Sequence, residues 1–192
     1  MEQREIKRAL IDSAIHTIAK VGIDSATTKL LANNAGVNEV YIYRIFGGKE
    51  NLFKEAFVFV DNDFSATLLD LLPKAYSQSL TTEARFKNLF ELVWKYATSD
   101  KEKCSFFIRY YYSRCYTIEL SLERKAIYAA VMKKFDTAFE RGTDTWWLFN
   151  HILDVVFSSA VKVLREEIPD NEETQENIFN LLYPAIKQYL KN

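Results

Sequence analysis

Polar and aromatic side chains gather on one short segment that lies between two glycine turns, at residues 30–52. Gly36 predicts a tight turn, because glycine adopts a positive φ at little cost. Asn38 then stands where a helix N-cap is expected, and its side-chain oxygen can accept a backbone N–H of the next helix. Gly47-Gly48 predicts the end of that helix after about two turns. Ile42, Ile45 and Phe46 can share the inward face of this helix. Its polar and aromatic residues fall largely on other faces: Glu39, Tyr41, Tyr43 and Arg44.

A helix of about two turns is unstable alone, so larger elements must hold it in place. A short, polar-faced helix after a glycine turn has the layout of a helix-turn-helix, whose second helix enters the major groove of DNA. An ordinary pair of packed helices has the same spacing, and spacing alone leaves both interpretations open.

Residues 27–53 (TTKLLANNAGVNEVYIYRIFGGKENLF) closely resemble the DNA-binding segment of the TetR family of bacterial transcriptional regulators. A glycine that ends the preceding helix, Gly22, also fits this family. The matching residues are Thr27, Leu31-Ala32, Ala35-Gly36-Val37, Tyr43, Phe46, Lys49 and Leu52-Phe53. The resemblance implies a double-stranded DNA operator, a small-molecule effector and a homodimer as partners, with no cofactor and no metal.

The same resemblance implies a role for each matching polar position. Phosphate contacts are expected from Thr27 or Thr28, Asn38, Tyr43 and Lys49. The start of the helix beside Lys49 adds backbone N–H groups and a favourable dipole. Such contacts fix the position of the protein on the duplex but read no sequence.

Base contacts are expected from Glu39, Val40, Tyr41 and Arg44. Arg44 could bind guanine with two hydrogen bonds, Val40 could touch a thymine methyl, and Glu39 could accept from cytosine or favour the helix start by its charge. The sequence departs from the family at two positions. At the position of Val40 the family commonly has Gly, and the side chain of Val40 prevents the closest approach of the backbone to the groove. At the position of Ile45 the family commonly has His or Tyr, and Ile45 cannot make their polar contact with a phosphate.

Helical periodicity predicts an all-α fold of about nine helices, and only five glycines and three prolines interrupt the chain. The longest predicted helix spans residues 48–72 and stops before Pro73. By resemblance to the family, it joins a three-helix DNA-binding head (1–54) to a helical regulatory domain for ligand binding and dimerisation (55–192). Further predictions are a polar break at 77–82, a single helix from 121 to about 142, and a kink or shifted start at Pro184.

Abundant aromatic residues in the second part of the chain suggest an apolar effector pocket with phenol and indole groups. A densely packed aromatic core is the alternative for any one of them. The predicted pocket residues are Phe64, Trp94, Phe107, Tyr110, Tyr111, Trp147 and Phe157.

By resemblance, the last two helices pair with their copies in a four-helix bundle. The apolar stripe of the helix from residue 144 or 145 to 168 is broad enough for both a core and an interface, although it could also pack only its own core. The predicted interface residues are Leu153, Phe157, Val161, Leu164, Phe179, Leu182 and Ile186.

Composition bounds the remaining function classes. The net charge is −1, and residues 1–54 hold eight basic and six acidic residues, which is a weak asymmetry for a DNA-binding head. No phosphate-binding loop, zinc spacing or nucleophile motif occurs, so no enzyme is expected. Without a signal peptide or an apolar run of spanning length, a cytoplasmic protein without membrane contact is expected. The expected function is a repressor released from a pseudo-palindromic operator by a small apolar or aromatic effector; the alternative is a helical metabolite-binding or protein-interaction module that does not bind DNA.

Overall fold

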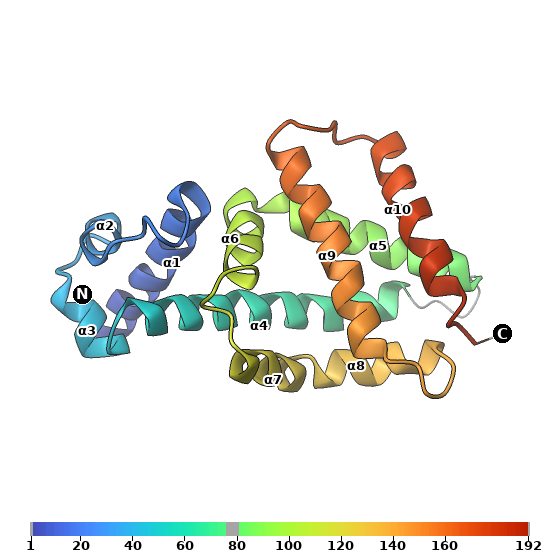
Figure 1. Ribbon diagram of the computed structural model, residues 1–192, viewed down its shortest axis with the longest axis horizontal. Coiled ribbons are helices and arrows are strands. Elements are labelled where there is room, and N and C mark those ends of the chain that lie inside the picture. Colours follow the sequence, from blue (N-terminus) through green and yellow to red (C-terminus); the bar gives the residue numbers. More distant parts are fainter. Residues whose placement is uncertain (1, 76–80, 192) are drawn as a thin grey trace. The chain divides into compact units, whose positions relative to one another are not determined.

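The computed structural model describes residues 2–75 and 81–191, which are helical apart from turns and one isolated bridge. The contacts divide the chain into two compact units. Unit 1 holds Met1–Asp63 and Glu102–Arg124, and unit 2 holds Phe64–Lys101 and Lys125–Asn192. Helix α4 (Lys49–Ala75) is continuous and contributes residues to both units (Figure 1).

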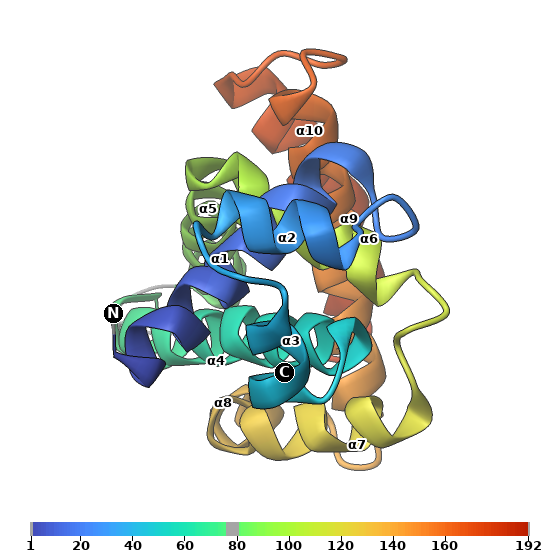
Figure 2. The same ribbon diagram turned by 90° about the vertical axis from the view of Figure 1, so that its left-hand side faces the viewer.

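Unit 1 is built around the first three helices. Besides the first part of α4, it contains α1 (Gln3–Val21), α2 (Thr28–Asn34), α3 (Val40–Phe46), most of α6 (Lys101–Tyr111) and the first part of α7 (Ile118–Ile127). Its apolar positions recur at helical spacing and are buried, among them Leu10, Leu31 and Ile42, so the two short helices are held by α1. The buried hydroxyl of Ser13 donates to the carbonyl of Leu31 at 2.7 Å and fixes α1 to α2. The two helices lie next to each other in Figure 2.

Helix α6 belongs to unit 1 because it is bonded to both α1 and α4. Arg109 Nη1 donates to the carbonyl of Ile18 at 3.1 Å, where it helps to satisfy the C-terminal end of α1. The ring of Phe57 on α4 stacks on Phe107 and Tyr110, with centroids 5.3 and 4.7 Å apart. The domain boundary at residue 54 stays a prediction, while the packing joins the head to residues as far along the chain as Arg124.

A buried ion pair connects α4 and α7 within unit 1. Arg124 Nε donates to Asp61 Oδ2 at 2.7 Å, and the two side chains are 1% and 0% exposed. The guanidinium carbon also lies 5.5 Å from the ring centroid of Phe107 and 5.3 Å from that of Tyr111. Aromatic faces attract a cation, so the buried charge is compensated by both a carboxylate and rings.

Unit 2 is a second helical bundle. It contains the end of α4, then α5 (Thr82–Ser99), α8 (Ala129–Phe135), the 3₁₀ turn η1 (Asp136–Ala138), α9 (Thr145–Leu164) and α10 (Glu172–Lys187). Side-chain caps begin its longer helices: Thr81 accepts from Ala84 N at 3.2 Å, and Asn171 accepts from Thr174 N at 2.9 Å. Helix α9 packs on α5 and α10, and these helices supply most of the core.

Two predicted helix boundaries were wrong. Helix α4 continues through Pro73 to Ala75, the last described residue before a gap, because a proline removes only one backbone hydrogen bond of the helix. The single helix expected from residue 121 to about 142 is two helices, α7 and α8, which are separated at the buried Tyr128. Pro184 lies inside α10, which starts at Glu172. Most of the polar break expected at 77–82 lies outside the described residues.

By length and composition alone, α9 is apolar enough to cross a membrane, and it is the only such helix in the described ranges. The prediction that no run reaches this length was therefore wrong. The apolar side chains of α9 pack within unit 2, and core helices of water-soluble proteins share this composition.

Candidate nucleic-acid interface and effector cavity

The turn between α2 and α3 has the geometry expected from its glycine. Thr27 is the N-cap of α2, where its hydroxyl accepts a hydrogen bond from Leu30 N at 3.2 Å. Gly36 has a φ of +65°, a region that residues with a side chain rarely adopt. The chain then turns back, with Val37 N donating to the carbonyl of Ala32 at 3.0 Å. This turn sets the direction in which α3 leaves α2.

Asn38 was expected to be the N-cap of α3, but it lies one residue before the N-cap. Its side chain still accepts a backbone N–H of the helix, as predicted. The N-cap of α3 is Glu39, whose side chain makes no cap hydrogen bond, while Asn38 Oδ1 accepts from Val40 N at 2.9 Å. Gly47 ends the helix at a φ of +77°. Both ends of this short helix are therefore defined by local interactions.

Helix α3 turns one face to the core of unit 1 and the other to solvent. Ile42 and Phe46 are buried, and Ile45 is half-buried. On the outward side, Val40 and Tyr43 are 62% and 58% exposed. The outward face is completed by Glu39 and Arg44, both exposed, and by the half-buried Tyr41. No side chain of the described residues encloses Arg44, which is what a helix that reads base edges requires.

Lys49, at the start of α4, has a partner inside the protein. Its Nζ donates to the carbonyl of Ala26 at 3.4 Å and lies 6.0 Å from the ring centroid of Phe53. The half-buried Lys49 thus fixes the start of α4 to the loop that precedes Thr27. Of the predicted phosphate-binding residues, Thr27, Asn38 and Tyr43 are exposed, whereas Thr28 and Lys49 are half-buried.

We expect Asn38→Ala to lower the free energy of unfolding by about 1 kcal/mol, because it removes the side-chain acceptor of Val40 N–H at the start of α3. Thermal unfolding of the purified variant measures this loss. Asn33→Ala is the control, because Asn33 is exposed and no side-chain hydrogen bond of it is found among the described residues. Equal effects of the two substitutions would contradict a capping role for Asn38.

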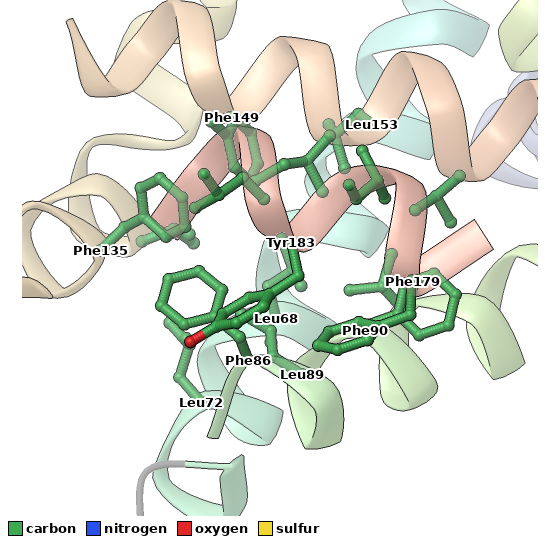
Figure 3. A pocket seen from close by; sticks show the side chains of 16 residues that line it. Leu68, Leu72, Phe86, Leu89, Phe90, Phe135, Phe149, Leu153, Phe179 and Tyr183 are labelled. Atoms are coloured by element: carbon green, nitrogen blue, oxygen red, sulfur yellow. The ribbon is translucent and has the colours of Figure 1, made fainter. Parts of the chain in front are cut away.

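Unit 2 contains a cavity between α4, α5, α8, α9 and α10 (Figure 3). Its lining is apolar, with Phe86, Phe90 and Phe149 among the side chains around it. The oxygen drawn in Figure 3 is the hydroxyl of Tyr183, whose pKa is raised by burial and then by the charge of Glu83, so the phenol stays neutral. The cavity volume is ≈ 50 Å³. Pockets that hold drug-sized ligands measure roughly 300–1,000 Å³, so a ligand of that size requires the lining helices to separate.

None of the predicted pocket residues lines this cavity. Phe107, Tyr110 and Tyr111 belong to the aromatic cluster of unit 1 around Phe57 and Arg124. In unit 2, Phe64 and Phe157 pack against each other with centroids 5.3 Å apart. Trp94 Nε1 donates to Asp170 Oδ1 at 3.1 Å, and Trp147 is exposed. The aromatic density of the sequence reflects core packing in two separate units, which residue type alone could not reveal.

The predicted dimer interface stays a prediction, although the single chain already buries most of its residues. Six of its seven residues are buried within the single chain, because the apolar stripes of α9 and α10 pack in the core of unit 2: Leu153, Phe157, Val161, Phe179, Leu182 and Ile186. Only Leu164 is partly exposed. Four of the buried residues line the cavity instead: Leu153, Phe179, Leu182 and Ile186. The large apolar residues that these helices expose are Trp147 on α9 and Leu181 on α10. Helical periodicity could not single them out, because it follows the apolar stripe that faces the core.

Metal coordination has no candidate in the described part of the chain, where no group of three or more His, Cys, Asp or Glu side chains is placed to hold an ion. The residues brought together at the turn and on α3 are hydrogen-bonding and aromatic groups on one solvent-facing surface. This arrangement is suited to contacts with a polyanion and with base edges.

Comparison with known proteins identifies both the motif and the fold. Residues 10–56 match the model of the family described as bacterial regulatory proteins, tetR family. The comparison with curated proteins gave no match. A TetR family transcription regulator from Marinobacter aquaeolei VT8 has a similar structure, with a TM-score of 0.77 and 16% identity over 96% of this chain and 98% of that one.

Two other solved structures share the fold. A TetR-family transcriptional regulator from Haemophilus influenzae has a TM-score of 0.67 and 16% identity, with 98% of each chain covered. The transcriptional regulator FadR from Bacillus subtilis, solved in complex with stearoyl-CoA, has a TM-score of 0.66 and 15% identity, over 91% of this chain and 96% of that one. At these identities the structural likeness concerns the fold.

Proposed function

We propose that this chain, whose residues 10–56 match the model of the tetR family of bacterial regulatory proteins, is a repressor that binds a pseudo-palindromic operator as a homodimer and leaves it when a small apolar effector binds. The observation that carries this proposal is the solvent-facing side of α3, where Arg44, Tyr43 and Val40 stand free of the protein core. No catalytic step is part of the proposal.

On this proposal α3 lies in the major groove, and its exposed side chains meet base edges. Arg44 binds guanine with two hydrogen bonds, and Val40 contacts a thymine methyl. The hydroxyl of Thr27 and the side chains of Asn38 and Tyr43 contact phosphates on either side. Lys49 acts mainly by holding the loop before Thr27 in position, because its ammonium already donates to the carbonyl of Ala26.

The effector acts through α4. This helix begins at Lys49 beside the DNA-binding turn, and Leu68 and Leu72 near its other end line the cavity of unit 2. A ligand that separates the cavity-lining helices shifts the tilt of α4 and so changes the distance between the two reading helices of the dimer. It can do so only through a difference in its affinity for the two states. An effector that binds the protein but leaves its operator affinity unchanged would refute this mechanism.

The dimer forms through the outward sides of α9 and α10. Leu181 is 78% exposed on α10, and Trp147 is 58% exposed on α9, where its ring stacks on His151 with centroids 5.7 Å apart. Pro184 and Ala185 on α10 are exposed as well. Large apolar side chains that one chain leaves in water are typical of a surface that a partner covers.

Arg44→Ala is expected to weaken operator binding by about 1–3 kcal/mol and to relax the base preference at one operator position, because one bidentate base contact is lost. The measurement is a salt-dependent titration of the DNA upstream of the protein's own gene, with single-base operator variants. The salt slope of the unmodified protein also reports how many phosphates are contacted.

Arg114→Ala is the matched control, because Arg114 is a highly exposed arginine of unit 1 that lies outside the helix-turn-helix and forms a surface ion pair with Asp24 at 3.5 Å. We expect it to leave operator affinity unchanged. Uniform weakening on all DNA sequences after Arg44→Ala would contradict a reading role for Arg44. Absence of salt-dependent DNA binding by the unmodified protein would favour the alternative of a helical module that does not bind DNA.

A further inference from the structure

A groove with an apolar floor runs between the last turns of α4 and helix α8. Leu69, Leu72 and Pro73 line it on the side of α4, and Lys133 and Lys134 line it on the side of α8. Its volume is ≈ 830 Å³. That volume lies within the range of roughly 300–1,000 Å³ that is typical of small-molecule sites. The groove is therefore large enough for a ligand without rearrangement of unit 2.

Leu72 lies between this groove and the cavity of unit 2. Its side chain lines both spaces and is itself buried. Among the described residues, the floor is formed by the aliphatic side chains of Leu69, Leu72 and Pro73. Burial of apolar surface along these side chains suits a flexible alkyl chain.

The side of the groove formed by α8 is positively charged. Lys133 and Lys134 are exposed, and neither forms an ion pair within the described residues. Lys191 Nζ donates to the carbonyl of Thr137, another lining residue, at 2.9 Å, which brings a third ammonium group to this side. The acidic residues that adjoin the groove in sequence are Asp70 and Asp136. The three lysines and these two aspartates together carry a net positive charge. The carboxylate of Asp136 also accepts a hydrogen bond from the hydroxyl of Thr145.

We propose that the groove binds an aliphatic carboxylic acid of medium or long chain, with its alkyl chain on Leu69, Leu72 and Pro73 and its carboxylate between Lys133 and Lys134. The apolar floor excludes sugars and nucleotides, whose polar groups would lose their hydrogen bonds to water there without replacement. The two ammonium groups favour an anion over a neutral lipid. The groove is a second site beside the cavity in which the proposed effector binds, so this inference goes beyond the proposed function.

The test is calorimetric titration of the full chain, without DNA, using decanoate and 1-decanol as probes. We expect the unmodified protein to bind decanoate more tightly than decanol. The double variant Lys133→Gln, Lys134→Gln should bind decanoate about tenfold more weakly and decanol with unchanged affinity, because only the charge-assisted contacts are removed. The matched control is Lys162→Gln, Lys187→Gln, in which two exposed lysines of α9 and α10 outside the groove are replaced, and it should behave like the unmodified protein.

A second variant tests the place of the alkyl chain. Ala130 lies exposed on α8 within the groove, and Ala130→Trp should fill the floor and weaken the binding of both probes. Decanoate affinity unchanged in Lys133→Gln, Lys134→Gln, or in Ala130→Trp, would overturn the proposal. So would binding to phosphatidylglycerol vesicles without binding to decanoate monomers, since this would make the groove a membrane-contacting surface. Because no DNA is present, a failure of the operator proposal leaves this result intact.

Discussion

Leu181→Arg is expected to convert the proposed homodimer to monomers and to weaken operator binding about a hundredfold or more, because each monomer would then bind its half-site independently. Leu181 is 78% exposed on α10, so within the single chain it contributes little to the core of unit 2. At a symmetric interface each substitution occurs twice, and two arginines would be buried against an apolar partner surface. Analytical ultracentrifugation measures the oligomeric state, and titration of the operator measures the affinity.

Ile118→Arg is the matched control for this experiment. Ile118, on α7, is also an aliphatic residue that is 78% exposed, but it lies outside α9 and α10. We expect this variant to remain a dimer and to keep its affinity for the operator. If Leu181→Arg stayed dimeric while Ile118→Arg dissociated, the interface would have to be reassigned to α7.

The second large effect concerns the buried ion pair of unit 1. Asp61→Asn should lower the free energy of unfolding by about 3–5 kcal/mol, because Arg124 then stays charged and buried without its carboxylate. The rings of Phe107 and Tyr111 near the guanidinium can offset only part of this cost. Chemical denaturation followed by circular dichroism measures the difference.

Two further variants separate the pair from its surroundings. Asp61→Leu combined with Arg124→Met removes both charges and should recover most of the lost stability, because no unpaired charge remains buried. Glu55 is on α4 like Asp61, but its ion pair with Lys7 of α1 is at the surface, with Lys7 Nζ and Glu55 Oε2 2.6 Å apart. Glu55→Gln breaks this pair and should lower the free energy of unfolding by less than about 1 kcal/mol. Equal losses for Asp61→Asn and Glu55→Gln would show that burial does not raise the cost of breaking the pair.

The helix-turn-helix could be predicted well because local interactions define it. The positive φ of Gly36, the bond from Val40 N–H to Asn38 and the end of α3 at Gly47 all involve residues that are close in the chain. The exposed side of α3 followed from helical periodicity, because the apolar residues of a two-turn helix must face the only core available to it. One local signal was misleading: Pro73 predicted the end of the long helix, but α4 continues to Ala75.

The part of the chain after the helix-turn-helix was predicted less well, because its features depend on contacts between distant residues. From the sequence, an aromatic residue such as Phe107 could line a pocket or belong to a core. In the structure its ring stacks on Phe57 of another helix. The apolar stripes of α9 and α10 could likewise face the protein's own core or a partner. Leu153 and Phe179 line the internal cavity, and this moved the proposed interface to Leu181 and Trp147.

By itself, the amino-acid sequence determined the helical class, the turn at Gly36 and the identity of the side chains that α3 presents to solvent, because backbone conformation and helical period depend on neighbours a few residues apart. Only the tertiary structure decided which apolar residues enclose the cavity, that Asp61 and Arg124 meet in the interior of unit 1, and that Lys133 and Lys134 line one side of an aliphatic groove. These features join residues far apart in the chain, and the packing that brings them together has no signature in any one segment.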